Sequence, residues 1–338
     1  MIRVSAIIVV GGSDQEQRTA SDASILAAGV ISTSLSSVEL LGSSPLQRTI
    51  RRLRYQGVEC IQVVSTTERS GSDDEVGVPF EIALDSEAAW AKAADFAREY
   101  AERGTDVILI MRLGAYVEVS LERFVENHRD RAKGITRLYD HNGPLDIWLI
   151  DGERIRKNQH LTGARDMLTD RPSRYAGCSY VNRLESMSDL RRLAVDILLM
   201  RCATTPGGTQ TKPGVWIDEG AVVDKSVRLV GPSYVGRNAR IRPSVLLTRF
   251  SHVESNCEID FGTAIEDSSI LSNTYVGPSL DVTHAVVSEN YITHLQKNVA
   301  LEIMDPLLVG NATSNVPVHS VKHRAMAAHW VERLIQTS

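Results

Sequence analysis

Cysteine and aromatic residues are scarce in this sequence, and long apolar runs are missing. Its 338 residues include four cysteines, with no Cys-x-x-Cys pair among them, and 5% aromatic residues. Widely separated cysteines are typical of a chain that keeps its thiols reduced, so we expect a cytoplasmic protein without disulfides. No apolar run approaches the roughly 20 residues that a membrane helix needs, so we expect no membrane insertion.

The chain also lacks an excess of positive charge. It has 37 Lys and Arg residues against 42 Asp and Glu residues, which gives a formal net charge of -5. A protein that binds nucleic acid through its phosphates needs a basic surface, so we expect no nucleic-acid partner. The length is typical of two domains, each large enough for its own core.

Strand and helix patterns alternate through the first 200 residues. Strands are expected at 6–10, 60–64 and 107–111, and helices at 45–57, 86–103 and 121–133. Such alternation is typical of an α/β fold with a mostly parallel sheet. In these sheets ligands bind beyond the carboxyl ends of the strands, which points to the segments 11–18, 65–69 and 112–116.

The order of these segments resembles that of the sugar-phosphate nucleotidyltransferase family. The resemblance is carried by the first strand with Gly11-Gly12, by Leu41-Gly42-Ser43-Ser44-Pro45, and by the stretch 57–64. It implies a Rossmann-like nucleotidyltransferase domain over residues 1–203 and a role in nucleotide-sugar or surface polysaccharide biosynthesis. It also implies that a nucleotide or nucleotide sugar is bound by Gly11, Gly12, Ser13 and Arg18.

Several positions depart from the motifs of that family. The third glycine of the loop is replaced by Asp14, and the lysine position before Pro45 is Ser44. Where the family places metal-binding aspartates, this sequence has Arg112 and Asn182. Because these side chains cannot build the site of hard oxygen ligands that Mg²⁺ needs, we expect a degraded metal site and a binding or assembly role, that of a pseudoenzyme. The candidates that remain for a catalytic role are Arg18, Arg112 and Asn182, and the fixed charge of Arg112 can partly replace the cation.

A six-residue period runs through the second half of the chain after a Pro- and Gly-containing linker at 204–213. Its aliphatic positions are Ile217, Val223, Leu229, Val235, Ile241, Leu247, Val253, Ile259, Ile265 and Leu271. Such hexads predict a left-handed parallel β-helix at 214–312, in which three hexads form one coil and the aliphatic side chains point inward. We expect the period to slip by one residue near 275–277.

The pairing of an α/β domain with a hexapeptide-repeat domain is similar to the architecture of mannose-1-phosphate guanylyltransferases. It implies a homo-oligomer, most simply a dimer, that assembles through the C-terminal half. A terminal α-helix is expected at 317–336, because apolar residues from Val321 to Ile335 share one helical face. That face can cover an end of the β-helix or contact a second subunit.

Two alternative functions stay open on the sequence alone. The first is an active nucleotidyltransferase, which makes a nucleotide sugar and pyrophosphate at a rearranged site and needs Mg²⁺ as its cofactor. The second is a hexapeptide acyltransferase with a histidine base in a cleft between coils, for which the candidates are His252, His284 and His294. His319 and His323 have metal-ligand spacing but no third ligand nearby, so we expect no metal there.

Overall fold

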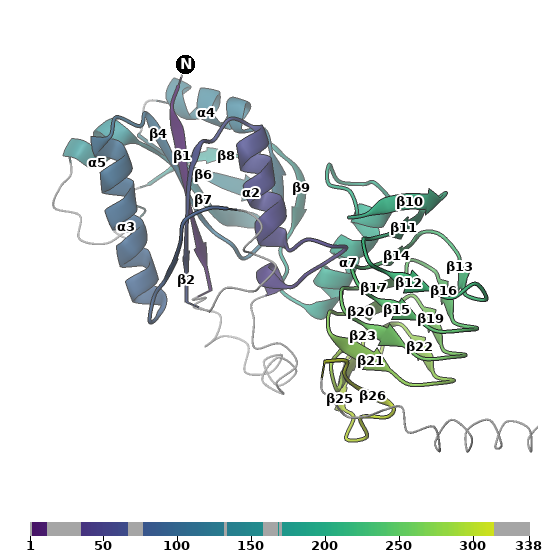
Figure 1. Cartoon of the computed structure of the whole chain (residues 1–338). Helices are drawn as coiled ribbons and strands as arrows, with labels where there is room; N and C mark the ends of the chain where they lie inside the picture. The colour runs from purple at the N-terminus through teal and green to yellow at the C-terminus, as the bar shows by residue number, and fades with distance from the viewer. Residues whose placement is uncertain are drawn as a thin grey trace, which may run out of the picture.

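The computed structural model describes residues 2–11, 35–66, 77–131, 134–157, 168 and 171–313 (Figure 1). A mixed α/β N-terminal part is followed by a C-terminal part built almost entirely of short strands. The helix expected at 317–336 and the loop residues Gly12, Ser13 and Arg18 lie outside the described residues. No helix in the described ranges is long and apolar enough to cross a membrane.

Seven strands form the N-terminal sheet, in the order β3-β2-β1-β4-β7-β6-β8. They are β1 (Val4–Val10), β2 (Cys60–Ser65), β3 (Phe80–Ile82), β4 (Val107–Arg112), β6 (Ile135–Asp140), β7 (Gly143–Asp151) and β8 (Ser173–Tyr175). The pairs β1–β2, β1–β4, β2–β3 and β6–β8 are parallel. Strand β7 runs antiparallel to both β4 and β6, so the sheet is mixed but rich in parallel pairs.

Helices cover both faces of this sheet (Figure 1). They are α2 (Pro45–Tyr55), α3 (Ser86–Glu102), α4 (Leu121–Asp130) and α5 (Gly152–Lys157), with α7 (Met187–Leu198) further along the chain. Side chains alternate along β1: Ala6, Ile8 and Val10 pack with α2 and α4, whereas Ile7 and Val9 pack with α3 and α5. This is the alternation that a strand buried on both faces requires. A short 3-10 helix, η3 (Leu35–Ser37), precedes α2, and β5 (Tyr116–Val119) pairs with β9 (Cys178–Asn182) outside the sheet.

The C-terminal part returns repeatedly to three parallel sheets and is β-helix-like. The first sheet contains β11 (Val215–Ile217), β14 (Ser233–Val235), β17 (His252–Val253), β20 (Ser269–Ile270) and β23 (Ala285–Ser288). The second contains β12 (Val222–Val223), β15 (Arg240–Ile241), β18 (Glu258–Ile259) and β21 (Thr274–Val276). The third contains β13 (Arg228–Leu229), β16 (Leu246–Thr248), β19 (Ala264–Glu266) and β22 (Asp281–Thr283). We call this stack the coils.

Antiparallel strands lie at both ends of the coils. Strand β10 (Thr209–Lys212), inside the segment expected as a linker, pairs with β11. At the other end β24 (Tyr291–His294) pairs with β23, β25 (Val299–Glu302) pairs with β24, and β26 (Val309–Asn311) pairs with β21.

The register of the coils corrects one detail of the predicted period. Val235 lies beside Val253, 18 residues later, but Val253 lies beside Ile270, which is 17 residues later. The one-residue slip therefore falls between Ile265 and Ile270, earlier than expected. Ile270 joins the core of the coils, and the prediction that Leu271 points inward is wrong, because Leu271 packs in a different cluster. Because both residues are aliphatic, an unbroken six-residue period selected Leu271 and gave no sign of the slip.

That second cluster joins the two parts of the chain, and we call it the joint. It combines residues of α7 and the Leu40–Leu41 turn with Tyr234, Leu271 and Val286 of the coils. Polar contacts cross the joint as well: the Glu254 carboxylate accepts hydrogen bonds from the amides of Leu41 (2.7 Å) and Gly42 (3.2 Å). Both turn residues have positive φ, 51° and 80°, which directs their adjacent N–H groups toward one anion.

Candidate functional site

The strand order of the N-terminal sheet marks where a ligand is expected. After β1, the chain forms β2 and β3 on one side of β1 and then crosses over to form β4 on its other side. The direction in which strands are added to the sheet therefore reverses between β1 and β4. Open α/β sheets bind ligands beyond the carboxyl ends of the strands at such a point. Here Arg112, the last residue of β4, lies beside Val9 of β1. We call the carboxyl ends of β1 and β4, with the residues that directly follow them, the β1/β4 edge.

Gly11 lies at this edge with a backbone conformation that favours glycine. Its φ is +83°, and a Cβ atom built on it would lie 2.1 Å from the hydroxyl oxygen of Thr66. The chain therefore passes very close to the end of β2 as it leaves β1. This is the kind of close backbone approach for which glycine is needed. The structure thus places one residue of the predicted nucleotide-binding loop at the expected edge.

Arg112 belongs to a group of charged side chains that the sequence did not bring together. It forms an ion pair with Asp146, whose other oxygen accepts a hydrogen bond of 2.7 Å from Arg137. Arg137 also donates from Nε to the carbonyl of Leu145 (2.8 Å), and its guanidinium lies 4.8 Å from the ring centroid of Trp148. Asp146 therefore joins two guanidinium groups that come from β4 and β6.

A third guanidinium group, that of Arg183, lies in the same region. Its Nε and Nη2 donate to the two oxygens of Asp140, at 3.0 and 2.7 Å. This two-point hydrogen bond lowers the pKa of Asp140, and it raises the pKa of Arg183, with a smaller contribution from the charge of Asp146. We call Arg112, Arg137 and Arg183, with Asp140 and Asp146, the arginine cluster. The three guanidinium groups of the cluster outnumber its two carboxylates, and the carboxylate of Glu185, 3.9 Å from Arg183, brings the formal charge of the whole group to zero.

Asn182, the other predicted position, serves a different purpose. Its side chain is fully buried, its amide nitrogen donates to the carbonyl of Asp189 (2.9 Å), and its amide oxygen accepts from the backbone of Leu184 (3.0 Å). These bonds hold the turn that leads into α7. The neighbouring residue, Arg183, is the one that reaches the charged group.

The described residues at this edge, which exclude those directly after Gly11, do not fit the divalent cation that the family resemblance implies. Both carboxylates of the arginine cluster are already engaged by guanidinium groups. No three His, Cys, Asp or Glu side chains in the described part of the chain are grouped as a metal site requires. A cation would also meet three fixed positive charges here, and the hard-oxygen ligands that Mg²⁺ needs are taken.

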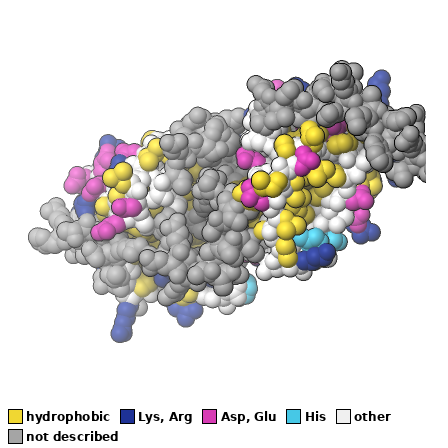
Figure 2. Space-filling view, turned by 90° about the horizontal axis from the view of Figure 1, so that it is seen from below, with side chains coloured by type: hydrophobic (Ala, Val, Ile, Leu, Met, Phe, Trp, Pro, Cys, Tyr) yellow, Lys and Arg dark blue, Asp and Glu magenta, His cyan; other side chains and the backbone are white. Residues whose placement is uncertain are grey.

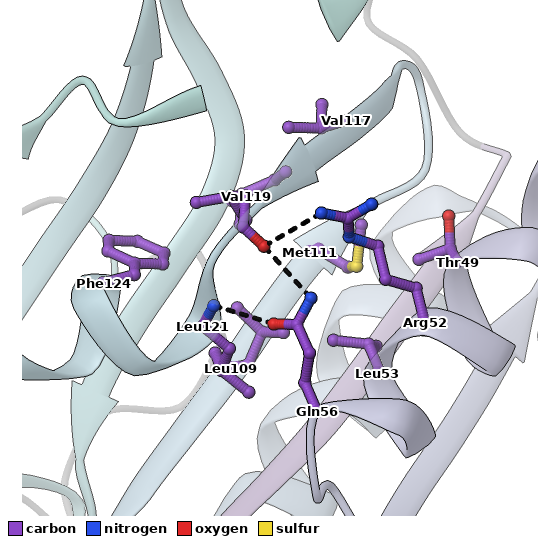
Figure 3. Close-up of a pocket in the computed structure, with 11 residues that line it drawn as sticks. Thr49, Arg52, Leu53, Gln56, Leu109, Met111, Val117, Val119, Leu121 and Phe124 are labelled. Atoms are coloured by element: carbon purple, nitrogen blue, oxygen red, sulfur yellow. Dashed lines mark hydrogen bonds between the residues drawn. The ribbon is translucent and has the colours of Figure 1, made fainter. Parts of the chain in front are cut away.

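An apolar pocket lies beneath α2, with about 400 Å³ of empty space counting its open mouth (Figure 3). It is lined by Thr49, Arg52, Leu53, Gln56, Leu109, Met111, Val117, Val119, Leu121, Phe124 and Ile147. Gln56 donates to the carbonyl of Val119 (3.1 Å) and accepts from the amide of Leu121 (2.7 Å), which ties α2 to β5 and α4. The one charged lining residue, Arg52, lies 3.5 Å from Glu118. Its lining offers mainly apolar contact; the hydroxyl of Thr49 already donates to the carbonyl of Pro45 (2.8 Å), and no lining side chain is suited to act as an acid or base.

The histidines considered for acyl transfer lie in the coils. His252 is fully buried at the joint, where Nδ1 accepts from Arg191 (3.4 Å) and Nε2 lies 3.5 Å from a Glu254 oxygen. Its burial keeps it away from any acyl donor in solvent. His284 is half-buried, with Nδ1 2.6 Å from Asp267, and its ring lies 6.5 Å from that of His294. The role of His284 as a base stays a prediction.

The buried His252 predicts a loss of stability in acid. Burial, with the nearby charge of Arg191, holds its pKa well below 6.5, so the folded chain takes up its proton less readily than the unfolded chain. Stability should therefore fall as the pH drops below 6.5. The neighbouring Glu254 has a raised pKa, which acts in the opposite direction. We expect His252→Asn to reduce the acid-induced decrease in melting temperature between pH 7.5 and 5, whereas the exposed His141→Asn should leave it unchanged. Equal pH profiles for the wild type and His252→Asn would contradict this account.

Four residues of the arginine cluster were missed as site residues by sequence reasoning: Arg137, Asp140, Asp146 and Arg183. Their contacts join residues 9 to 43 positions apart, so no local motif signals them. The available signal was that arginine-containing segments stand at both positions where carboxylates were expected.

Comparison of the chain with models of protein families finds no match, and comparison with curated proteins finds none.

Proposed function

We propose that this chain is a sugar-1-phosphate nucleotidyltransferase-like protein that binds a nucleotide or nucleotide sugar and acts as a binding or assembly subunit. The observation that carries the proposal is the reversal of strand order between β1 and β4, with Gly11 at that point. In finer terms, the N-terminal part is then a Rossmann-like domain and the coils are a left-handed β-helix. The arginine cluster, in place of a metal site, favours binding over nucleotidyl transfer.

Gly11 offers a sharp test of the nucleotide site. Gly11→Ala should weaken nucleotide binding, because the added Cβ would meet Thr66 and push the chain away from the β1/β4 edge. Gly57→Ala is the matched control, since φ is +87° there and nothing lies within 4 Å of its added Cβ. Both variants carry a similar backbone strain of about 1 kcal/mol, so only the local clash differs.

The measurement is calorimetric titration with nucleoside triphosphates, nucleoside diphosphates and nucleotide sugars, with and without Mg²⁺. We expect binding by the wild type and Gly57→Ala, at least tenfold weaker binding by Gly11→Ala, and no pyrophosphate release from a triphosphate plus a sugar 1-phosphate. Mg²⁺-dependent turnover would instead establish the active-enzyme alternative. A wild-type protein that binds none of these ligands would refute the proposal.

The coils are also the proposed assembly module, most simply of a dimer. Hydrophobic side chains gather on the C-terminal part in Figure 2, and the exposed large ones near its end are Val299, Leu301, Met304, Leu307 and Leu308. Among the described strands β25 is an edge strand of its sheet, and its backbone groups could pair with a second copy.

Oligomerisation should be measured on the full chain, because separated halves would expose the apolar joint. We expect light scattering to report an oligomer for the wild type and a monomer for Leu301→Glu. Leu84→Glu, at a fully exposed leucine of the N-terminal part, is the control and should remain oligomeric. A monomeric wild type would exclude this assembly.

A further inference from the structure

The arginine cluster stands where a nucleotide's phosphates would arrive. Arg112 is the last residue of β4 and lies opposite Val9 of β1, which is two residues before Gly11. Asp146 lies at the start of β7, next to the end of β4, and Asp140 ends β6. The charged groups of three neighbouring strands therefore meet at the edge where the sheet is expected to bind its ligand.

The cluster is built to hold positive charge in place. Asp146 fixes Arg112 and Arg137, and Asp140 fixes Arg183 through two parallel hydrogen bonds. Asp140 is 3% exposed, whereas the three arginine side chains are 24–26% exposed. Asp140 is thus a buried anchor for Arg183, whereas Asp146, at 25%, is as exposed as the two arginines it joins. Glu185, 3.9 Å from Arg183 and half-exposed, marks the rim.

The cluster offers N–H donors to an anion and no open carboxylate to a cation. Its three guanidinium groups outnumber its two carboxylates, and half-exposed Glu185 at the rim supplies the charge that balances them. The guanidinium groups are partly desolvated, so they interact with an anion more strongly than they would at the open surface. Guanidinium groups match the geometry of phosphate oxygens and cannot lose their proton in a protein. Divalent cations neutralise phosphates in nucleotidyl transfer, and two fixed guanidinium groups carry the same total charge without being released.

We propose that Arg112 and Arg183 form a metal-independent binding site for the diphosphate of a nucleotide or nucleotide sugar, with Asp140 and Asp146 as positioning residues. This inference rests on the proposed function for the identity of the complete ligand, but the diphosphate site itself can be tested alone. The site replaces the absent metal ligands with cations supplied by the protein. Arg137, whose guanidinium group lies over the ring of Trp148, holds Asp146 in place by donating a hydrogen bond to it.

Inorganic pyrophosphate in the presence of EDTA is the probe for this site. In calorimetric titrations of the full chain we expect pyrophosphate to bind without metal, and the affinity to fall by roughly 10- to 100-fold in Arg112→Gln and in Arg183→Gln. Arg183→Lys, which keeps the charge but loses the two-point hydrogen bond to Asp140, should fall between Arg183→Gln and the wild type. Binding should weaken with salt, and less steeply in each Gln variant.

Two arginines away from the cluster serve as matched controls. Arg228→Gln alters an exposed arginine of β13 in the coils, and Arg103→Gln alters one that follows α3 at the amino ends of the strands. Both should bind pyrophosphate like the wild type. Melting temperatures of all variants establish that each is folded at the titration temperature, and Arg183→Lys keeps the test valid if Arg183→Gln is not folded.

The same titrations with nucleoside diphosphates separate this inference from the proposed function. Pyrophosphate binding that depends on both arginines, without nucleotide binding, would uphold the site and reject the proposed function. Nucleotide binding that is unchanged in Arg112→Gln and Arg183→Gln would uphold the function and reject the site. A requirement for Mg²⁺, or no pyrophosphate binding by the wild type, would overturn the inference.

Discussion

Replacing Val253 by aspartate is expected to unfold the coils. Val253 is fully buried in β17 and packs in the core between Val235 and Ile270 of the neighbouring coils. Aspartate there would lose the apolar contacts and bury a carboxylate with no partner. Because each coil packs on the coils beside it, disruption in the middle of the stack spreads in both directions. We expect a loss of about 4 kcal/mol or more in the free energy of unfolding.

Val222→Asp is the matched control for that experiment. It makes the same substitution in β12 of the same stack, at a valine whose side chain is 63% exposed. Its effect should stay within about 0.5 kcal/mol, as is usual for surface positions. Urea unfolding followed by circular dichroism measures both variants. Equal stabilities for the two would show that Val253 does not point into the core.

The second large effect is expected for Arg48→Met. Arg48 is almost completely buried at the start of α2, where it donates to the carbonyls of Leu40 (2.7 Å), Leu41 (3.1 Å) and Thr205 (2.9 Å). Methionine has similar length and flexibility, so it fills the space, but it removes these donors. The carbonyls of Leu40 and Leu41 still accept from the amides of Ser43 (3.4 Å) and Gly207 (2.9 Å), whereas the Thr205 carbonyl loses its donor. We expect a loss of roughly 2–4 kcal/mol, since a buried group without a partner costs about 1–3 kcal/mol and each further lost hydrogen bond about 0.5–1.5 kcal/mol.

Arg51→Met provides the comparison, one turn further along α2. Arg51 is exposed and donates to the Ser43 hydroxyl (2.8 Å), so its loss should cost well under 1 kcal/mol. Thermal unfolding and amide exchange at residues 40–43 measure the two variants together. If Arg48→Met leaves the exchange of these amides as slow as in the wild type, Arg48 does not hold the turn.

The sequence predicted most helices and strands of the N-terminal part, because caps and apolar spacing are local. The helix expected at 45–57 is α2 at Pro45–Tyr55, with Ser44 as its N-cap, and the helix expected at 86–103 is α3 at Ser86–Glu102. The antiparallel placement of β7 between β4 and β6 was not predicted, since strand direction depends on which strands meet in the sheet. The hexads likewise predicted the repeated coils up to Ile265, where the following turn is one residue shorter.

The candidate site was predictable only in its location. Gly11 and Arg112 could be placed at the carboxyl edge of the strands because that edge follows from the α/β order. The partners of Arg112 could not, because Asp146 reaches it only through the antiparallel β4–β7 pairing. The same holds for Arg183, whose contact with Asp140 spans 43 residues and depends on the turn that Asn182 holds.

The joint has a consequence for how this protein can change in length during evolution. Repeat proteins commonly gain or lose whole repeats, because each repeat contacts only its neighbours. Here Glu254 holds the Leu41–Gly42 turn, Arg191 of α7 donates to Asp267, and Leu271 and Val286 pack in the joint. Duplication of one coil before Glu254 would move these contacts by one strand spacing, about 4.8 Å. The contacts with the α/β part therefore require these coils to keep their positions, and duplication of an 18-residue unit before Glu254 should be selected against in this chain.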